Sequence, residues 1–317
     1  MVPYITQRKF ILTDFQVKIG SAEFKNPVFV ASGTFGYGVE IVDLVDISKI
    51  GAIVTKSISL MPREGNPPPR IVETSSGMIN SIGLANIGVE KYIEEMLPQY
   101  AQISTPIITN IVGWTFDDYI EVLRKLETVS SNIIGYEINI SCPNVKKGGM
   151  EFGTDPETVE RLTSTLRKTT DRLLIMKLSP NVTDIASIAL SAERGGADAV
   201  SAINTVVGMS IDPYSHQSNI FTTFGGLSGP AIKPIGLAAV QKVYRKVTIP
   251  IIGIGGISSG NDVVEYMLAG ASAVQVGTAT FRHPDAANQI FDQLKTYCQT
   301  QNIQQISNLT GKVKLHS

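Results

Sequence analysis

Cysteine, charge of one sign and long apolar runs are all scarce in this 317-residue sequence. The only cysteines, Cys142 and Cys298, lie far apart and form neither a disulfide framework nor a metal-ligand spacing, which fits a reducing cytosol. With 27 basic and 28 acidic residues the net charge is −1, which gives no sign of a dedicated polyanion-binding surface. No run reaches the ~18 apolar residues of a membrane span, and the start lacks the apolar segment of a signal peptide. We therefore expect a soluble cytoplasmic protein that binds no metal, nucleic acid or membrane.

Short apolar runs rich in Val and Ile alternate with amphipathic segments along the chain. Because these runs mostly lack polar alternation, they predict strands buried on both faces of a parallel sheet. Eight such strands with helices between them predict an α/β protein, a closed (β/α)8 TIM barrel, with an open doubly wound sheet as the alternative. The predicted strands are 27–31, 52–57, 106–111, 133–140, 173–178, 199–204, 249–254 and 273–276. The predicted helices are 89–103, 116–129, 156–170, 184–194, 232–245, 261–268 and 285–300.

Two further features complete the predicted barrel. Residues 15–19 and 23–25 flank Gly20-Ser21 ahead of the first barrel strand, which predicts an N-terminal β-hairpin that closes the barrel floor. Three connections, 58–88, 141–155 and 205–231, are too long to be simple turns, and long structureless stretches in a compact domain are usually functional. All three follow strands, so we expect long loops at the C-terminal mouth, where the active sites of such barrels form.

Glycines at the end of the predicted barrel indicate a phosphate site. Gly255-Gly256 follows strand seven and Gly277-Thr278 follows strand eight. Glycines there let backbone N–H groups approach a phosphate, and these two loops are the usual phosphate site of the barrel. Gly229, ahead of another helix, could add a donor. Tight turns that merely need glycine are the alternative, but two pairs at these two strands favour a phosphate.

Two lysines stand at strand ends, where an ammonium needs a partner. Lys177 lies within the apolar segment LLIMKLS and Lys56 within AIVTKSIS. An unpaired ammonium inside a strand is costly, so we expect Lys177 to face an anionic or strongly polar partner in the barrel mouth. The alternative for each is a lysine that extends to solvent. Two such lysines opening toward one mouth favour a negatively charged ligand.

The segment EINISCPN carries the sharpest chemical signal. Asn139 closes strand four, and Cys142 opens a glycine-containing loop. A thiol over the barrel mouth can act as a base if nearby cations stabilise its thiolate, although it could also be an ordinary loop thiol. Cys298 shares a helical face with Ile290 and Leu294, which indicates core packing instead.

Asparagines gather at predicted strand ends. Each offers donors and an acceptor, the mixture that a planar, amide-rich ring would need, although any one alone is more typical of a turn. They are Asn80, Asn110, Asn139, Asn144 and Asn204.

Ten segments make the sequence resemble the dihydroorotate dehydrogenase family over almost the whole chain. They occur in the family's order and at compatible spacing, which makes the resemblance highly specific. The segments are VASGTFGYG, VTKSIS, PREGNPPPRIVET, MINSIGLANIGVE, NISCPNVKKGG, KLSPN, INTVVGM, GGLSGPAIKP, IIGIGGI and VQVGTATF. The resemblance implies oxidation of (S)-dihydroorotate to orotate in de novo pyrimidine (UMP) biosynthesis. It also implies that residues 1–317 form a single FMN-binding barrel domain.

The resemblance assigns roles to individual positions. It makes Cys142 the catalytic base, which takes a proton from the ring methylene while FMN accepts the hydride of the neighbouring carbon. It places Lys177 against a flavin ring oxygen as a second catalytic residue. The positions that match FMN-binding residues are Ser32, Lys56, Ser57, Asn110, Asn139, Lys177, Ile203, Gly229, Gly255, Gly256, Gly277 and Thr278. The positions that match substrate-binding residues are Lys56, Asn80, Ser81, Ile82, Gly83, Leu84, Asn139, Asn144, Asn204 and Thr205.

Within the family, the sequence is most similar to the NAD-linked branch (B type) of the soluble class with a cysteine base. The resemblance implies a homodimer of barrels with a partner subunit that carries FAD and [2Fe–2S], in a heterotetramer. We expect neither group on this chain, because no G-x-G-x-x-G turn follows a strand in a Rossmann-type unit. Two isolated cysteines likewise cannot hold a cysteine-ligated cluster, which needs about four.

Other functions stay open. Another FMN-dependent pyrimidine oxidoreductase would have a similar barrel, and the fumarate-linked branch of the same family differs mainly in its electron acceptor. A tRNA dihydrouridine synthase should carry an RNA-binding domain and a basic surface, which the balanced charge does not indicate. A non-enzymatic barrel that serves in binding or assembly is disfavoured by the presence of Cys142, Lys56 and Lys177.

Overall fold

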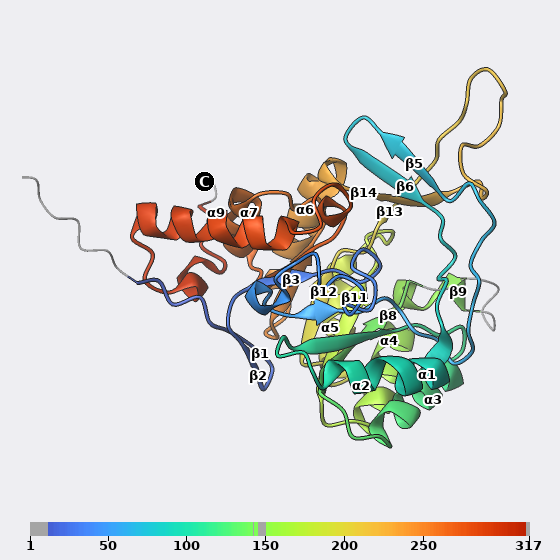
Figure 1. Cartoon of the computed structure of the whole chain (residues 1–317), viewed down its shortest axis with the longest axis horizontal. Helices are drawn as coiled ribbons and strands as arrows, with labels where there is room; N and C mark the ends of the chain where they lie inside the picture. The colour runs from blue at the N-terminus through green and yellow to red at the C-terminus, as the bar shows by residue number, and fades with distance from the viewer. Residues whose placement is uncertain (1–11, 142, 145–149, 315–317) are drawn as a thin grey trace, which may run out of the picture.

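Eight parallel strands close into a barrel in the computed structural model, which describes residues 12–141, 143–144 and 150–314 (Figure 1). The strand order around the barrel is β11-β12-β15-β16-β3-β4-β7-β8. This confirms the predicted (β/α)8 barrel over the open doubly wound sheet. The strands are β3 (Val28–Val30), β4 (Ile53–Val54), β7 (Ile107–Ile111), β8 (Ile133–Asn139), β11 (Leu173–Leu178), β12 (Ala199–Ala202), β15 (Ile251–Ile254) and β16 (Ala273–Val276).

The barrel strands are buried on both faces, as their apolar runs predict. Every residue of β7 and β11 is buried, because one face packs against helices and the other faces the barrel interior. The strand predicted over 52–57 is shorter, because its pairing with β7 becomes irregular after Val54: the Asn110 N–H donates to Thr55 Oγ1, and the Asn110 carbonyl accepts from the Ile58 N–H. The Lys56 N–H donates to the carbonyl of Gly36, in the loop after β3. The strand β4 therefore ends early, and Lys56 lies just beyond it.

The predicted helices form between the strands, with one interruption. The helix predicted over 89–103 contains a π-helical turn, Tyr92–Met96, between α1 and α2. Pro98 in α2 has no N–H to donate, so the regular hydrogen-bond pattern cannot continue through it. The α-helices are α1 (Gly88–Lys91), α2 (Leu97–Tyr100), α3 (Phe116–Glu127), α4 (Pro156–Arg167), α5 (Ile185–Arg194), α6 (Lys233–Tyr244), α7 (Gly260–Ala269), α8 (Ala279–Arg282) and α9 (Ala286–Gln301). Short 3-10 turns cover Ile47–Lys49, Phe152–Thr154, Pro230–Ile232 and Ile306–Leu309.

The N-terminal hairpin is present where the sequence predicts it. The strands β1 (Val17–Ile19) and β2 (Ala22–Phe24) pair antiparallel around Gly20, whose φ is +58°. A Cβ at Gly20 would lie 2.9 Å from Asp198 Cβ and 3.1 Å from Leu173 Cδ1, at the starts of β12 and β11. The hairpin turn therefore packs against the barrel floor.

Two of the long connections together form an antiparallel sheet and so are not structureless. The sheet has the order β13-β14-β6-β5 and lies beside the barrel mouth, at the upper right of Figure 1. Its strands are β5 (Ile71–Thr74), β6 (Gly77–Asn80), β13 (Val206–Gly208) and β14 (Gly225–Ser228). The connection after β8 contains a second small pair, β9 (Pro143–Asn144) with β10 (Met150–Glu151). Within the described ranges, no helix has the length and apolar character needed to cross a membrane.

Candidate active site

A buried polar network centred on Glu137 occupies the barrel interior. Glu137 Oε1 accepts hydrogen bonds from Asn110 Nδ2 (2.7 Å) and Lys177 Nζ (3.1 Å). Its Oε2 accepts from Ser201 Oγ (2.9 Å) and Gln275 Nε2 (2.6 Å). The Lys177 side chain is only 7% exposed, so its ammonium does not extend to solvent. The anionic partner expected for Lys177 is the carboxylate of Glu137, a group of the protein itself. The charge of Lys177 alone therefore does not require an anionic ligand.

Glu137 is the residue that sequence reasoning missed, although a signal was present. It stands two residues before Asn139 on β8, and alternate residues of a strand point to the same face. Glu137 and Gln275 are polar residues in strands that are otherwise mostly apolar and buried. A polar residue at an inward position of such a strand needs buried partners, and this predicts an interior network.

Ser57 and Asn110 extend this network toward β4. Ser57 Oγ donates to Asn110 Oδ1 at 2.6 Å, which fixes the orientation of the amide whose Nδ2 reaches Glu137. The neighbouring Lys56 is half-buried, and none of the ion pairs between described residues involves it. Ser32, two residues beyond β3, is also half-buried. Lys56 thus supplies a cation at the mouth without a carboxylate partner in the described part of the chain.

Amide groups from two strands meet at the mouth. Asn204 Nδ2 donates to Asn139 Oδ1 (3.2 Å) and to Ser141 Oγ (3.0 Å). The Asn204 Oδ1 accepts from the backbone N–H of Thr205 (2.8 Å). These bonds join the ends of β8 and β12 across β11, which lies between them in the barrel. The predicted cluster of amides therefore includes Asn139 and Asn204. Ile203, which directly precedes Asn204 in the chain, is buried.

The segment Asn80–Leu84 enters the site from the antiparallel sheet. Asn80 Nδ2 donates to the carbonyl of Gly226 on β14 (3.3 Å), and Gly226 packs against the Thr205 side chain. Ser81 is buried, and its hydroxyl has no hydrogen-bond partner among the described residues. Such a hydroxyl needs a polar partner from outside the described structure, which fits a polar substrate. The segment ends with left-handed backbone at Gly83 (φ +74°) and Leu84 (φ +60°).

Three glycine-containing loops meet at the mouth. A Cβ at Gly256 would lie 2.8 Å from the carbonyl oxygen of Gly229. A Cβ at Gly229 would lie 3.6 Å from Thr278 Cγ2, and Thr278 Oγ1 donates to Ser228 Oγ at 2.8 Å. Gly229, Gly255 and Gly256 have φ of +92°, +127° and +67°, so these three positions require glycine for backbone reasons. At these three positions the turn itself therefore explains the glycine, without a bound phosphate.

Gly277 is different, and it is the position that fits a bound phosphate. Its φ is not positive, and a Cβ there would meet no protein atom closer than 3.5 Å, so neither backbone nor packing requires glycine. No backbone hydrogen bond between described residues has the N–H of Gly256, Gly277 or Thr278 as its donor. Backbone N–H groups need an acceptor, and clustered free ones form an anion site.

An ion pair holds two of these loops together. Lys233, at the start of α6, donates to Asp262 Oδ1 on α7 (2.7 Å). Asp262 also accepts from the backbone N–H groups of Ser258 and Ser259, both at 2.8 Å. Burial alone would raise the pKa of Asp262, but the hydrogen bonds from Lys233, Ser258 and Ser259 outweigh it and lower the pKa below its usual value. Asp262 therefore fixes the loop after β15 as an ionised group.

The loop of the predicted base is described only in part. Cys142 lies outside the described residues, and so does the side chain of Asn144. The backbone of β9 and β10 forms a short antiparallel pair next to Cys142 in the chain. The structure therefore places the loop after β8, at the mouth, without describing the thiol.

Cys298 is fully buried in α9, as predicted for a packing residue. Burial raises the pKa of its thiol to about 11, so the group stays protonated near neutral pH. His216 lies in the loop between β13 and β14, and His283 is the C-cap residue of α8.

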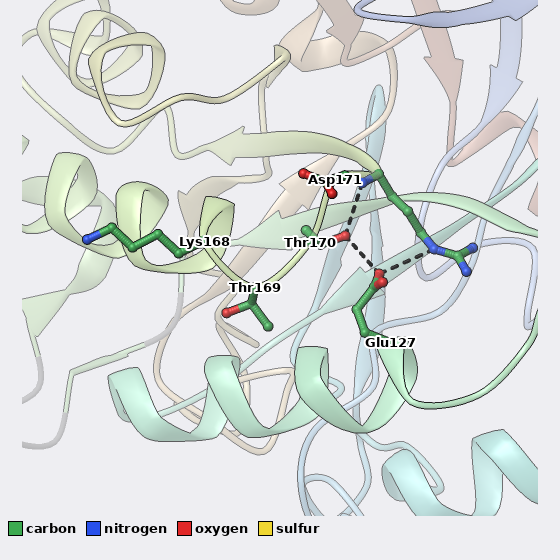
Figure 2. A pocket seen from close by; sticks show the side chains of 6 residues that line it. Glu127, Lys168, Thr169, Thr170 and Asp171 are labelled. Carbon is green, nitrogen blue, oxygen red and sulfur yellow. Dashed lines mark hydrogen bonds and ion pairs between the residues drawn. The ribbon is translucent and has the colours of Figure 1, made fainter.

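A surface hollow lies at the end of the barrel opposite the mouth, and its polar contacts stabilise the fold. The carboxylate of Glu127 accepts a hydrogen bond from Thr170 Oγ1 (2.7 Å) and lies 3.3 Å from Arg172 Nε (Figure 2). Glu127 ends the helix before β8, and Arg172 directly precedes β11, so the hollow belongs to the N-terminal face. Polar contacts at that face of such barrels serve stability.

Comparison with known proteins gives one consistent result. A family model described as dihydroorotate dehydrogenase matches residues 14–297. The catalytic subunit of dihydroorotate dehydrogenase B (NAD(+)) from Geobacter sp. (strain M21) is 47% identical over 302 residues, which cover 95% of this chain and 99% of the relative. The subunit of the same name from Pelobacter propionicus is 49% identical over 301 residues, with 95% and 99% covered. The one from Thermoanaerobacter sp. (strain X514) is 46% identical over 302 residues, with 95% and 99% covered.

Proposed function

The chain belongs to the dihydroorotate dehydrogenase family, and from this premise we propose that it oxidises (S)-dihydroorotate to orotate with FMN as cofactor. The reaction is a step of de novo pyrimidine (UMP) biosynthesis. The observation that carries the proposal is the cluster of backbone N–H groups at Gly256, Gly277 and Thr278, which have no backbone acceptor in the described part of the chain. Neither backbone conformation nor packing requires residue 277 to be glycine. This cluster lies at the mouth of a barrel whose interior holds Lys177.

The residues present fit FMN. The loops with Gly229, Gly255, Gly256, Gly277 and Thr278 would hold the phosphate through backbone N–H groups. Lys177 and Asn110, with the residues at the ends of β4 and β12, would hold the flavin ring. Bound there, FMN would supply the acceptor for the hydride that leaves the carbon of dihydroorotate that carries the carboxylate.

The amides and Lys56 would hold the substrate ring. Asn139 and Asn204 offer donors and acceptors to its ring edge, together with the segment Asn80–Leu84. The ammonium of Lys56, which has no carboxylate partner in the described structure, fits the carboxylate of dihydroorotate. Cys142 takes the proton from the ring methylene as the hydride leaves the neighbouring carbon, so one proton and one hydride are removed for each orotate formed.

We further propose that NAD is the final acceptor, reached through a partner subunit. The relatives are named catalytic subunits of an NAD(+) enzyme, which supports an arrangement with a second protein. FAD and [2Fe–2S] would be on that partner, and two barrels would form a dimer with one partner each. Electrons would leave the reduced FMN of this chain for the partner's groups.

A substrate panel tests the proposal against other pyrimidine oxidoreductases. FMN-loaded protein is given dihydroorotate, dihydrouracil or dihydrothymine with a dye as electron acceptor, and orotate is measured as the product. We expect turnover with dihydroorotate alone, because the other two lack the carboxylate that Lys56 would bind. Comparable turnover with dihydrouracil would contradict the assigned substrate.

A further inference from the structure

The carboxylate of Glu137 gathers hydrogen bonds from four other barrel strands. Its donors are Asn110 on β7, Lys177 on β11, Ser201 on β12 and Gln275 on β16, at 2.6–3.1 Å. Glu137 is fully buried. In the closed ring of eight strands β16 stands opposite β8, so the bond to Gln275 spans the barrel interior. The carboxylate therefore lies near the barrel axis.

The hydrogen bonds of Glu137 match those of a carboxylate paired with the Lys177 ammonium. The Lys177 ammonium can only donate, and the amide of Asn110 is oriented to donate because its Oδ1 already accepts from Ser57. With Ser201 and Gln275 on the other oxygen, both oxygens act as acceptors, which is the pattern of a carboxylate rather than a carboxylic acid. The pair with Lys177 thus joins a buried negative and a buried positive charge.

The strand register places Glu137 nearer the barrel floor than Lys177. Lys177 pairs with Asn139, whereas Glu137 pairs with Ile175, one alternate position nearer the floor. Lys177 therefore lies between Glu137 and the mouth, where the flavin ring would be. An ammonium against the ring favours the negative charge of reduced flavin, and a carboxylate behind it opposes that effect.

We propose that Glu137 is a positioning residue that sets the reduction potential of the flavin through Lys177. This inference rests on the proposed function, because it needs FMN above Lys177. Glu137 holds the ammonium at the barrel axis and offsets part of its charge. The bound flavin is thereby kept at a lower potential than Lys177 alone would give, so that it can pass its electrons on.

The isosteric change Glu137→Gln separates the charge from the packing. The new amide retains one oxygen for Asn110 and Lys177 and places an N–H group toward Ser201 and Gln275. Ser201 can accept as well as donate, and Gln275 Oε1 has no hydrogen-bond partner among the described residues, so both can turn to receive it. The variant therefore removes the charge while keeping the hydrogen bonds.

The test measures the midpoint potential of bound FMN at pH 6.5 in wild type, Glu137→Gln, Lys177→Met and the double variant. We expect Glu137→Gln to shift the potential to a less negative value, with reduced FMN bound about tenfold more tightly relative to oxidised FMN, or about 30 mV for a two-electron couple. Lys177→Met should shift it to a more negative value. In the double variant, the change at residue 137 should add nothing to the effect of Lys177→Met.

Three results would overturn the inference in distinguishable ways. An unchanged potential in FMN-loaded Glu137→Gln would show that Glu137 does not set the reduction potential, and it would not contradict the proposed function. A shift that persists in the double variant would show that Glu137 does not act through Lys177. A wild-type protein that takes up no FMN would contradict the proposed function as well. Should Glu137→Gln fail to fold, adding Lys177→Met should restore folding by removing the unpaired charge, and a double variant that also fails would assign Glu137 a structural role only.

Discussion

Gly229 and Gly256 touch across two loops of the barrel mouth. A Cβ at position 256 would lie 2.8 Å from the Gly229 carbonyl oxygen, so the loops after β14 and β15 meet at this point. Both residues have left-handed backbone, and glycine is needed at each for that reason alone. Gly277, on the third loop, has neither left-handed backbone nor a close contact. Substitutions at Gly277 and Gly256 can therefore distinguish an effect on FMN binding from an effect on folding stability.

Gly277→Ala should weaken FMN binding without weakening the fold. The new methyl group meets no protein atom closer than 3.5 Å, so the melting temperature of the FMN-free variant should stay close to that of wild type. The methyl group would keep a phosphate from the local N–H groups, and loss of one hydrogen bond to a charged group costs about 1.5–3 kcal/mol, or roughly 10–100-fold in affinity. Titration of the FMN-free protein with FMN measures the change.

Gly256→Ala is the matched contrast. Its φ of +67° and its contact with Gly229 make any side chain strained there, so this variant should lose about 1 kcal/mol or more of folding stability even without FMN. Equal FMN affinity in wild type and Gly277→Ala would contradict the proposal that the phosphate of FMN binds at Gly277.

Asp262→Asn should destabilise the protein in a pH-dependent way. The hydrogen bonds from Lys233, Ser258 and Ser259 hold the pKa of Asp262 below its usual value against the opposing effect of burial. A carboxyl group whose folded pKa is lowered contributes its stability above its unfolded pKa, about 3.9, and loses it as pH falls through the folded pKa. At pH 7 we expect a loss of about 1–3 kcal/mol in the free energy of unfolding, from weakened hydrogen bonds to a charged group.

Urea unfolding of wild type and Asp262→Asn at several pH values measures this difference. The gap between the two proteins should narrow as the pH is lowered below about 4. A gap that stays constant from pH 7 to pH 3 would show that the charge of Asp262 is not what stabilises the two loops.

Cys142→Ala should retain FMN and lose the chemistry. Loss of a general base slows a reaction by roughly 10²-fold or more, so flavin reduction by dihydroorotate should slow by that factor in stopped-flow measurements. Cys142→Ser should keep some activity, moved to higher pH, because a hydroxyl is a weaker acid than a thiol.

Cys298→Ala supplies the control for this prediction. Cys298 is buried and its pKa is raised to about 11, so its loss should leave the rate of flavin reduction unchanged. A near-normal rate in Cys142→Ala would rule out Cys142 as the base.

The isolated chain should not reduce NAD at a useful rate. One barrel, its hairpin and its loops use residues 12–141, 143–144 and 150–314, and no dinucleotide-binding motif is evident in the sequence. Anaerobic turnover with dihydroorotate should therefore proceed with dyes but not with NAD as sole acceptor. Robust NADH formation would contradict the need for a partner, and fast turnover with fumarate would place the protein in the fumarate-linked branch.

The barrel and the positions of its glycine-containing loops were predictable because each is encoded locally. Uninterrupted apolar runs specify buried parallel strands, and glycine pairs directly after strands specify where backbone groups are exposed. The sheet of β5, β6, β13 and β14 was not predictable, because Gly225–Ser228 reads GGLS and has little strand preference. It is a strand only because β6 and β13 pair with it on both sides.

The interior network was missed for a related reason. The position of Glu137 in β8 indicates a buried charge, but its partners Lys177 and Gln275 lie on strands distant in the sequence. Only the closed barrel shows that the Glu137 carboxylate accepts hydrogen bonds from both Lys177 and Gln275. The bonds of Asn204 to Asn139 and Ser141 likewise depend on tertiary structure.

An anaerobic titration of the FMN-loaded chain with dihydroorotate tests the central claim most directly. If the barrel mouth holds FMN and the substrate as proposed, the visible absorbance of oxidised flavin should fall in proportion to added dihydroorotate. It should reach its end point near one equivalent per flavin, with an equal amount of orotate formed. A flavin that stays oxidised under excess dihydroorotate would contradict the claim.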